Sequence, residues 1–343
     1  MADLFGLSLL AIGAILLTWG FDFVNGFHDS ANSIATIVAT KVLNPVQAVT
    51  MAAVCNFIGF LVLGSAVAAM IQTGIIHGNL IDPATSTFGI QLVFAALLGA
   101  IVWDLITWWL GIPTSSSHAL VGGLLGAGGA AVGIAAVNWD GVIKIVVFII
   151  ASPIAGFVAG FLIVALVTRS MRKTNRTASN RWFRHLQIAS SASYSITHGA
   201  NDAQKGMGVI MLILFASGAA AYDDKAFMWV AISCYAALAI GTFFGGWRIV
   251  KTMASRITKL EPYQGFSAET GAAVMLATTA HFGIPVSTTH TIAGSIMGVG
   301  SAKRASAVRW GIGRRIVYAW VLTIPAAATI SGIIFWSYLN FLM

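Results

Sequence analysis

The sequence predicts an all-α polytopic membrane protein made of two inverted-topology repeats, each with a broken helix and a Ser/Thr-tipped helical hairpin. Three observations support this fold class. Of the 343 residues, 58% are hydrophobic and only 9% are charged, whereas about a quarter of a soluble chain is charged. Apolar runs of roughly 18 or more residues, long enough to cross the hydrocarbon layer, recur along the chain. Two polar motifs occur once in each half.

The apolar segments predict the order of the membrane elements. The first, 7–40, runs on past Phe23 without a small-residue cleavage site, so we expect a retained helix rather than a cleaved signal. The segments 7–40 and 188–217 are interrupted by polar residues. The others lie at 46–71, 88–110, 112–136, 141–168, 226–250, 266–282, 284–300 and 312–338.

Basic residues predict the orientation of these segments. The loops at 169–184, 248–259 and 303–315 hold six, four and five of the 19 Lys and Arg residues, which is typical of cytoplasmic loops. The net charge of +8 therefore reflects topology, and we expect no nucleic-acid partner. Placing these loops inside puts both termini outside.

The chain divides almost in half. We expect a first repeat at 1–168, a basic cytoplasmic linker at 169–187 and a second repeat at 188–343, together forming one transmembrane domain. Residues 111–118 (Gly-Ile-Pro-Thr-Ser-Ser-Ser-His) match 283–290 (Gly-Ile-Pro-Val-Ser-Thr-Thr-His) at an offset of 172. Residues 26–29 (Gly-Phe-His-Asp) match 199–202 (Gly-Ala-Asn-Asp) at an offset of 173. Because each half holds an odd number of crossings, the repeats should be inverted, which is typical of secondary transporters.

Ionisable residues interrupt the first apolar segment. Burying a carboxylate at membrane depth costs at least ~2.5 kcal/mol on insertion scales, so such groups usually serve a function. We expect Gly26 to let the helix unwind and Asp29 to bind Na⁺ or carry a proton, with Asn32 beside it. His28 could relay protons. The alternative is a polar contact between helices.

The second interruption repeats this pattern with Asn201 and Asp202, flanked by His198 as a further proton-relay or gating candidate. It adds Gln204 and Lys205. The lysine could attract an oxyanion, or it could neutralise Asp202, and both alternatives stay open.

Hydroxyl side chains follow the proline of each hairpin motif, where helix N-caps belong. A helix N-terminus binds anions through its free N–H groups and its dipole. Two such termini could therefore hold a tetrahedral oxyanion, although ordinary capping is the alternative. Glu269, near the second hairpin, could relay protons, act in gating or complement a helix N-terminus. The hydroxyls are those of Ser115, Ser116, Ser117, Ser287, Thr288 and Thr289.

At these residues the chain resembles the inorganic phosphate transporter (Pit) family, which is related to the sodium–phosphate cotransporters of solute carrier family 20. Residues 26–32, both Gly-Ile-Pro hairpins and 198–206 carry the resemblance, which covers essentially the whole chain. It implies import of inorganic phosphate across the plasma membrane (a bacterial inner membrane) by alternating access. It further implies that the hairpin hydroxyls and Gln204 bind phosphate. The coupling cation would be held by Asp29, Asn32, Asn201 and Asp202.

One departure from the family pattern bears on the coupling ion. In the sodium-coupled members of the family, both halves carry a pattern similar to Gly-x-Asn-Asp. The first copy in this chain reads Gly-Phe-His-Asp. This is similar to the bacterial low-affinity branch, associated with proton symport and neutral metal–phosphate complexes. We therefore expect H⁺ rather than Na⁺ as the coupling ion, no cofactor, and no bound metal other than Na⁺ at Asp29 and Asp202 if Na⁺ is used.

Two other functions compete with phosphate transport. A sulfate permease of the same superfamily would carry a similar tetrahedral dianion. A membrane hydrolase is disfavoured because the chain has no Gly-x-Ser-x-Gly elbow, so we do not expect an enzyme. The lipid bilayer is an expected partner, and a homodimer is left open.

Overall fold

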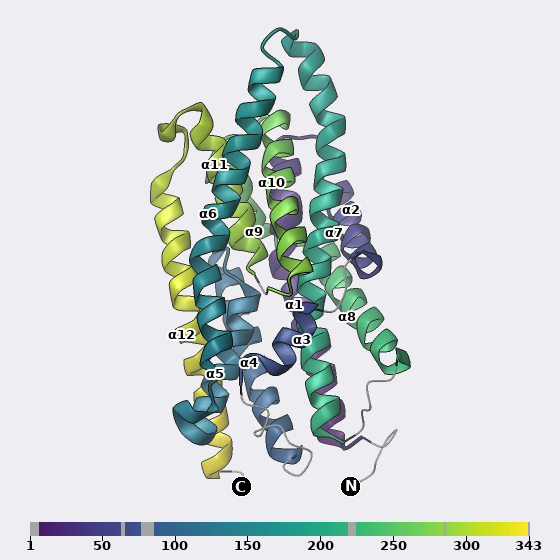
Figure 1. Ribbon diagram of the computed structural model, residues 1–343, viewed down its shortest axis with the longest axis vertical. Helices are drawn as coiled ribbons and strands as arrows, with labels where there is room; N and C mark the ends of the chain where they lie inside the picture. Colours follow the sequence, from purple (N-terminus) through teal and green to yellow (C-terminus); the bar gives the residue numbers. More distant parts are fainter. Residues whose placement is uncertain (1–6, 63–65, 77–85, 219–223, 285, 342–343) are drawn as a thin grey trace.

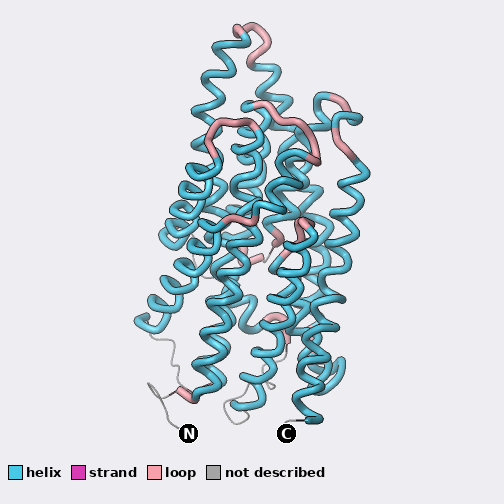
Figure 2. The backbone as a smooth tube through the Cα atoms, turned by 180° about the vertical axis from the view of Figure 1, so that it is seen from behind, coloured by secondary structure: helices cyan, strands magenta, loops and turns pink. Residues whose placement is uncertain are grey.

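The computed structural model describes residues 7–62, 66–76, 86–218, 224–284 and 286–341 (Figures 1 and 2). Pro285, predicted at the second hairpin turn, lies outside them. Short 3₁₀ turns occur at Gly59–Leu61, Gly133–Ala136 and Ala305–Ala307. The helices are α1 (Leu9–Ala39), α2 (Pro45–Ile58), α3 (Ala66–Thr73), α4 (Ser86–Leu110), α5 (Ser116–Val132), α6 (Trp139–Ser170), α7 (Arg176–Ala216), α8 (Asp224–Phe244), α9 (Trp247–Ser255), α10 (Pro262–His281), α11 (Thr288–Lys303) and α12 (Trp310–Phe341).

Long apolar helices confirm the predicted all-α membrane fold. Within the described residues, six helices are long and apolar enough to cross a membrane, among them all of α1, α6 and α12 and most of α4 and α8. Large apolar side chains cover the outside of these helices. Ile150 and Leu166 of α6 and Val321 of α12 are each more than 60% exposed. Such a surface is suited to lipid rather than to water.

The region predicted as the central linker is mostly helical. α6 continues to Ser170 and α7 begins at Arg176, so only five residues, 171–175, lie between the two helices. The side chain of Asn175 accepts a hydrogen bond from the Thr177 N–H, 2.9 Å away, and caps the start of α7. Figure 1 shows this turn at one end of the molecule, opposite the beginning of α1 and the end of α12. The start of α1 and the end of α12 thus lie on the same side of the molecule.

The predicted helix breaks are wrong, because both polar segments form continuous helices. α1 runs without interruption through residues 26–32, and α7 runs through 197–206. The glycines allow close packing instead. A Cβ atom at Gly26 would lie 2.0 Å from the Leu238 carbonyl oxygen of α8, and one at Gly199 would lie 2.3 Å from the Asn56 carbonyl oxygen of α2. Neighbouring helices occupy the space into which either backbone would have to unwind.

Helices of the two halves pack in matched pairs. If α1–α6 are matched in order with α7–α12, the contact between α1 and α8 corresponds to that between α7 and α2. The contact between α6 and α11 likewise corresponds to that between α12 and α5, and α1 with α4 to α7 with α10. This exchange of partners is what two related halves would produce. The inverted relation between them stays a prediction.

Both Ser/Thr-tipped hairpins are present. α4 and α5 form the first, and α10 and α11 the second, with their turns inside the molecule (Figure 2). Gly111 and Gly283 begin the turns with φ of +66° and +65°, a conformation that glycine adopts without steric cost. The tips meet, since the rings of His118 and His290 have centroids 4.7 Å apart. The hairpins therefore converge on the buried centre.

Candidate functional site

His28 and Asp29 of α1 form the first part of the buried centre. His28 Nδ1 lies 2.7 Å from Asp29 Oδ1. The other ring nitrogen lies 3.1 Å from the Thr107 hydroxyl of α4, which accepts a 2.9 Å hydrogen bond from Thr114 at the first hairpin tip. All four side chains are buried. His28 thus connects the carboxylate to the first hairpin.

The second hairpin contacts the same carboxylate. The hydroxyls of Thr288 and Thr289 donate to Asp29 Oδ2 over 3.4 and 3.3 Å. Asn32 Nδ2 donates to Thr289 Oγ1 over 2.8 Å. The structure therefore brings together residues that the sequence predicts at separate cation and phosphate sites.

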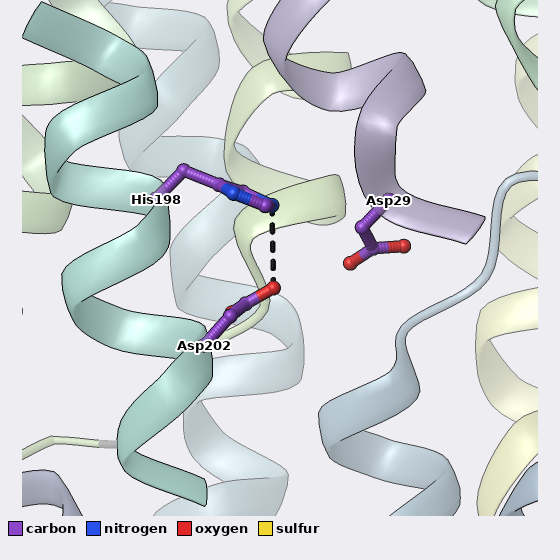
Figure 3. Close-up of side chains that lie close together, drawn as sticks. All are labelled: Asp29, His198 and Asp202. Atoms are coloured by element: carbon purple, nitrogen blue, oxygen red, sulfur yellow. Dashed lines mark ion pairs between the residues drawn. The ribbon is translucent and has the colours of Figure 1, made fainter. Parts of the chain in front are cut away.

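Asp202 of α7 faces Asp29 from the other half of the chain. It forms an ion pair with Lys205, and its Oδ2 lies 3.2 Å from His198 Nε2 (Figure 3). Lys205 is only 1% exposed, so of its two predicted roles the structure places it as the neutralising partner of Asp202. Asp29, His198 and Asp202 each offer one atom that could bind a metal ion, and these three atoms lie within 4.8 Å of one another.

Two further carboxylates make the centre strongly acidic. Asp22 of α1 lies beside the Cys234 thiol, and Asp104 of α4 lies beside the Ser116 hydroxyl. Both carboxylates are fully buried. Together with Asp29 and Asp202, they bring the number of buried aspartates at the centre to four. Among the described residues, Lys205 is the one buried lysine or arginine. Buried charge must be neutralised, so this centre favours protons or metal cations.

The hairpin serines cap their helices as predicted. Ser115 Oγ accepts from the His118 N–H over 3.4 Å, and Ser287 Oγ accepts from the His290 N–H over 3.2 Å. The His290 ring also stacks on Trp320 of α12, with centroids 3.8 Å apart. The two histidines therefore pack the hairpin tips together, while Ser116 and Ser117 occupy the buried first turn of α5.

Two amides predicted at the site form hydrogen bonds between helices. The Gln204 side-chain oxygen accepts from the N–H groups of Val67 and Ala68, over 2.9 and 3.3 Å, at the start of α3. Asn201 donates to the Leu276 carbonyl of α10 over 3.3 Å. The Gln204 NH₂ group donates one of its two hydrogens to the Ala200 carbonyl over 2.7 Å, within α7. Phosphate binding at Gln204 stays a prediction.

Glu269 belongs to a second buried polar cluster. Its carboxylate accepts from Thr36 of α1 over 2.5 Å, from Gln187 of α7 over 3.1 Å, and from Ser190 of α7. α10 begins at Pro262, so Glu269 lies too far along the helix to complement its N-terminus. The carboxylate instead ties three helices together beside the central cluster.

Sequence reasoning missed several residues of the centre. Thr107 was hidden in an apolar run, although it follows Asp104 by three residues on the same helix. Thr114 could have been included, since it directly precedes the hairpin serines. Asn56 on α2, whose side-chain oxygen lies 3.2 Å from His198 Nδ1, had no recognisable signal.

The sequence profile of the phosphate transporter family matches residues 25–331. The chain belongs to the phosphate transporter family. This confirms the resemblance based on the duplicated motifs.

Individual relatives agree over almost the full length. A probable low-affinity inorganic phosphate transporter of Rhizobium meliloti (strain 1021) is 51% identical over 96% of both chains. One of Bacillus subtilis (strain 168) is 44% identical, covering 95% of this chain and 96% of the relative. Among solved structures, the sodium-dependent phosphate transporter matches with a TM-score of 0.87 and 25% identity, covering 97% of this chain and 100% of that one.

Proposed function

We propose that this chain is a secondary active transporter that imports inorganic phosphate by cation symport through alternating access, with H⁺ as the coupling ion. The observation that carries the proposal is the convergence of Asp29 and Asp202 with both hairpin tips at one buried centre. Carboxylates attract cations, while helix N-termini and hydroxyls suit an oxyanion. The relatives from Rhizobium meliloti and Bacillus subtilis are both named as probable inorganic phosphate transporters, which supports phosphate as that oxyanion.

The contact between Asp29 and the second hairpin suggests how the two solutes are coupled. While Asp29 is ionised, it accepts from the hydroxyls of Thr288 and Thr289. Phosphate oxygens need the same donors, and a buried carboxylate would repel them. A cation bound at Asp29 neutralises the carboxylate, which weakens its repulsion of phosphate. It also weakens the hydrogen bonds from the two threonine hydroxyls, which can then donate to phosphate. Phosphate would then bind at these threonines together with Ser116 and Ser117 of the first hairpin.

Proton coupling fits the groups that already surround the carboxylates. Asp29 lies beside His28, and Asp202 is paired with Lys205. A hard cation such as Na⁺ is best held by several oxygen ligands, and here nitrogen atoms take part of that space. The matching solved structure is named as sodium-dependent, so Na⁺ is the main rival.

Uptake into proteoliposomes tests the proposal. Labelled phosphate uptake is driven separately by a pH gradient with Na⁺ absent and by a Na⁺ gradient at equal pH, with protein-free liposomes as the control. We expect concentrative uptake with the pH gradient. Uptake that follows only the Na⁺ gradient would assign Na⁺ coupling, and uptake that requires Mg²⁺ or Ca²⁺ would assign a metal–phosphate complex as cargo.

Competition separates the alternative functions. Strong inhibition of phosphate uptake by sulfate would favour the sulfate permease. Turnover of a phosphoester by purified protein, lost in Ser115→Ala, would favour the hydrolase. We expect neither result.

A further inference from the structure

A chain of hydrogen bonds leads from α8 through α2 to His198. The Thr242 hydroxyl donates to the Leu238 carbonyl over 2.9 Å. Asn56 Nδ2 donates to Thr242 Oγ1 over 2.9 Å, and Asn56 Oδ1 lies 3.2 Å from His198 Nδ1. The Asn56, Thr242 and His198 side chains are fully buried, where an unmet hydrogen bond is costly.

The direction of each bond follows from the number of hydrogens available. A threonine hydroxyl has a single hydrogen, and in Thr242 it is used on the Leu238 carbonyl. Thr242 can therefore only accept from Asn56, which must present its NH₂ group there. The amide oxygen of Asn56 then faces His198. An oxygen acceptor at this distance requires that His198 Nδ1 carry the hydrogen.

This tautomer leaves the opposite ring nitrogen without a hydrogen. In neutral His198, Nε2 then has a free lone pair, and it lies 3.2 Å from the carboxylate atom Asp202 Oδ2. Among the described residues, neither atom has an aligned hydrogen bond. Two buried acceptors that face each other are unfavourable unless a proton or another cation lies between them. Asp29 adds a third acceptor to the same group.

We infer that Asn56 is a positioning residue that holds His198 in the Nδ1–H tautomer, so that Nε2 and Asp202 Oδ2 jointly accept the coupling cation. Partners behind a ligating histidine commonly select its tautomer in this way. The role in coupling rests on the proposed cation symport. The tautomer does not, because it follows from the hydrogen bonds alone. A merely structural Asn56 would link α2 to α8 without determining which nitrogen of His198 is protonated.

The tautomer is measured on the full-length protein in lipid bilayers, with ¹⁵N-labelled histidine and solid-state NMR. Subtracting the spectrum of His198→Gln assigns the His198 signals. We expect an Nδ1–H signal in the unaltered protein, its loss in Asn56→Leu, and its retention in Asn56→Asp, which keeps an acceptor toward Nδ1. An Nε2–H tautomer in the unaltered protein, or an unchanged one in Asn56→Leu, would overturn the inference.

A pair of threonine variants provides a matched control. Thr242→Val removes the acceptor that orients Asn56, and we expect it to weaken the tautomer preference. Thr18→Val removes an equally buried hydroxyl, which donates to the Ala14 carbonyl over 2.8 Å, and should leave His198 unchanged. Equal effects of the two variants would contradict the proposed chain of bonds.

Transport kinetics test the role in coupling. In Asn56→Leu we expect the half-saturating concentration of the coupling cation to rise about tenfold, while that of phosphate at saturating cation is retained. Asn56→Asp should restore much of the cation dependence. An unchanged cation dependence in a folded Asn56→Leu protein would remove Asn56 from coupling. Absence of cation-driven uptake in the unaltered protein would instead refute the proposed function, and the NMR result would still decide the tautomer.

Discussion

Gly26→Ala would place a methyl group where α1 and α8 touch. The added Cβ atom would lie 2.0 Å from the Leu238 carbonyl oxygen, whereas Cβ contacts below 3.0 Å essentially never occur. The helices must therefore separate by about 1 Å. Because the obstructing atoms are backbone, no change of rotamer relieves the contact. Gly241 of α8 packs reciprocally, with a Cβ there lying 2.0 Å from the Phe23 carbonyl oxygen.

Overpacking of this kind costs about 1–3 kcal/mol, and we expect the upper end of that range because backbone atoms rather than a flexible side chain obstruct the methyl group. His28 and Asp29 lie within one turn of Gly26, so a shift of α1 also moves the site. A misplacement of about 1 Å can lower the rate of a positioned reaction by ~100-fold. We expect phosphate uptake to fall at least tenfold by the same reasoning.

Thermal unfolding of the purified protein and uptake into proteoliposomes measure the two effects. Gly20→Ala is the matched control, because it lies on the same helix and a Cβ there meets nothing within 4 Å. Alanine is about 1 kcal/mol more favourable than glycine in a helix, so this variant should be as stable as the unaltered protein or more so. If Gly26→Ala matched Gly20→Ala in both assays, the packing role of Gly26 would be refuted.

Three further substitutions test separate parts of the site. Asp29→Asn should abolish uptake driven by a pH gradient while the protein stays folded by size-exclusion chromatography; normal uptake would remove Asp29 from coupling. Ser287→Ala removes the cap of α11 and should lower the free energy of unfolding by about 1 kcal/mol, whereas Ser193→Ala, at an exposed serine of α7, should not. Glu269→Gln replaces one accepting oxygen with an NH₂ group and should cost about 1–3 kcal/mol in thermal unfolding; unchanged stability would show that this oxygen needs no donor.

Local features of the chain were predictable because they depend on neighbours in sequence. Ser115 and Ser287 each accept from the N–H three residues later, a bond within a single helical turn. Gly111 and Gly283 have the positive φ that a tight turn requires. The all-α class likewise followed from composition and from the length of the apolar runs.

The conformation at Gly26 could not be predicted in the same way. A glycine beside polar residues is compatible with an unwound helix and with a close helix crossing. The choice depends on which backbone lies at that depth, and here it is Leu238 of α8. The contacts of Asp29 with Thr288 and Thr289 join residues 259 and 260 positions apart, and no local pattern reports them.

The sequence by itself determined that this protein is an α-helical membrane protein of the phosphate transporter family, with two polar motifs in duplicate. Composition, helix capping and motif repetition can be recognised in the chain itself, without knowledge of how the helices pack. Only the tertiary structure decided that the helices run unbroken, that Asp29 accepts from the hydroxyls of the second hairpin, and that Asn56 lies beside His198. Each of these depends on which helices lie side by side, because buried polar groups must find their partners among the side chains at the same depth.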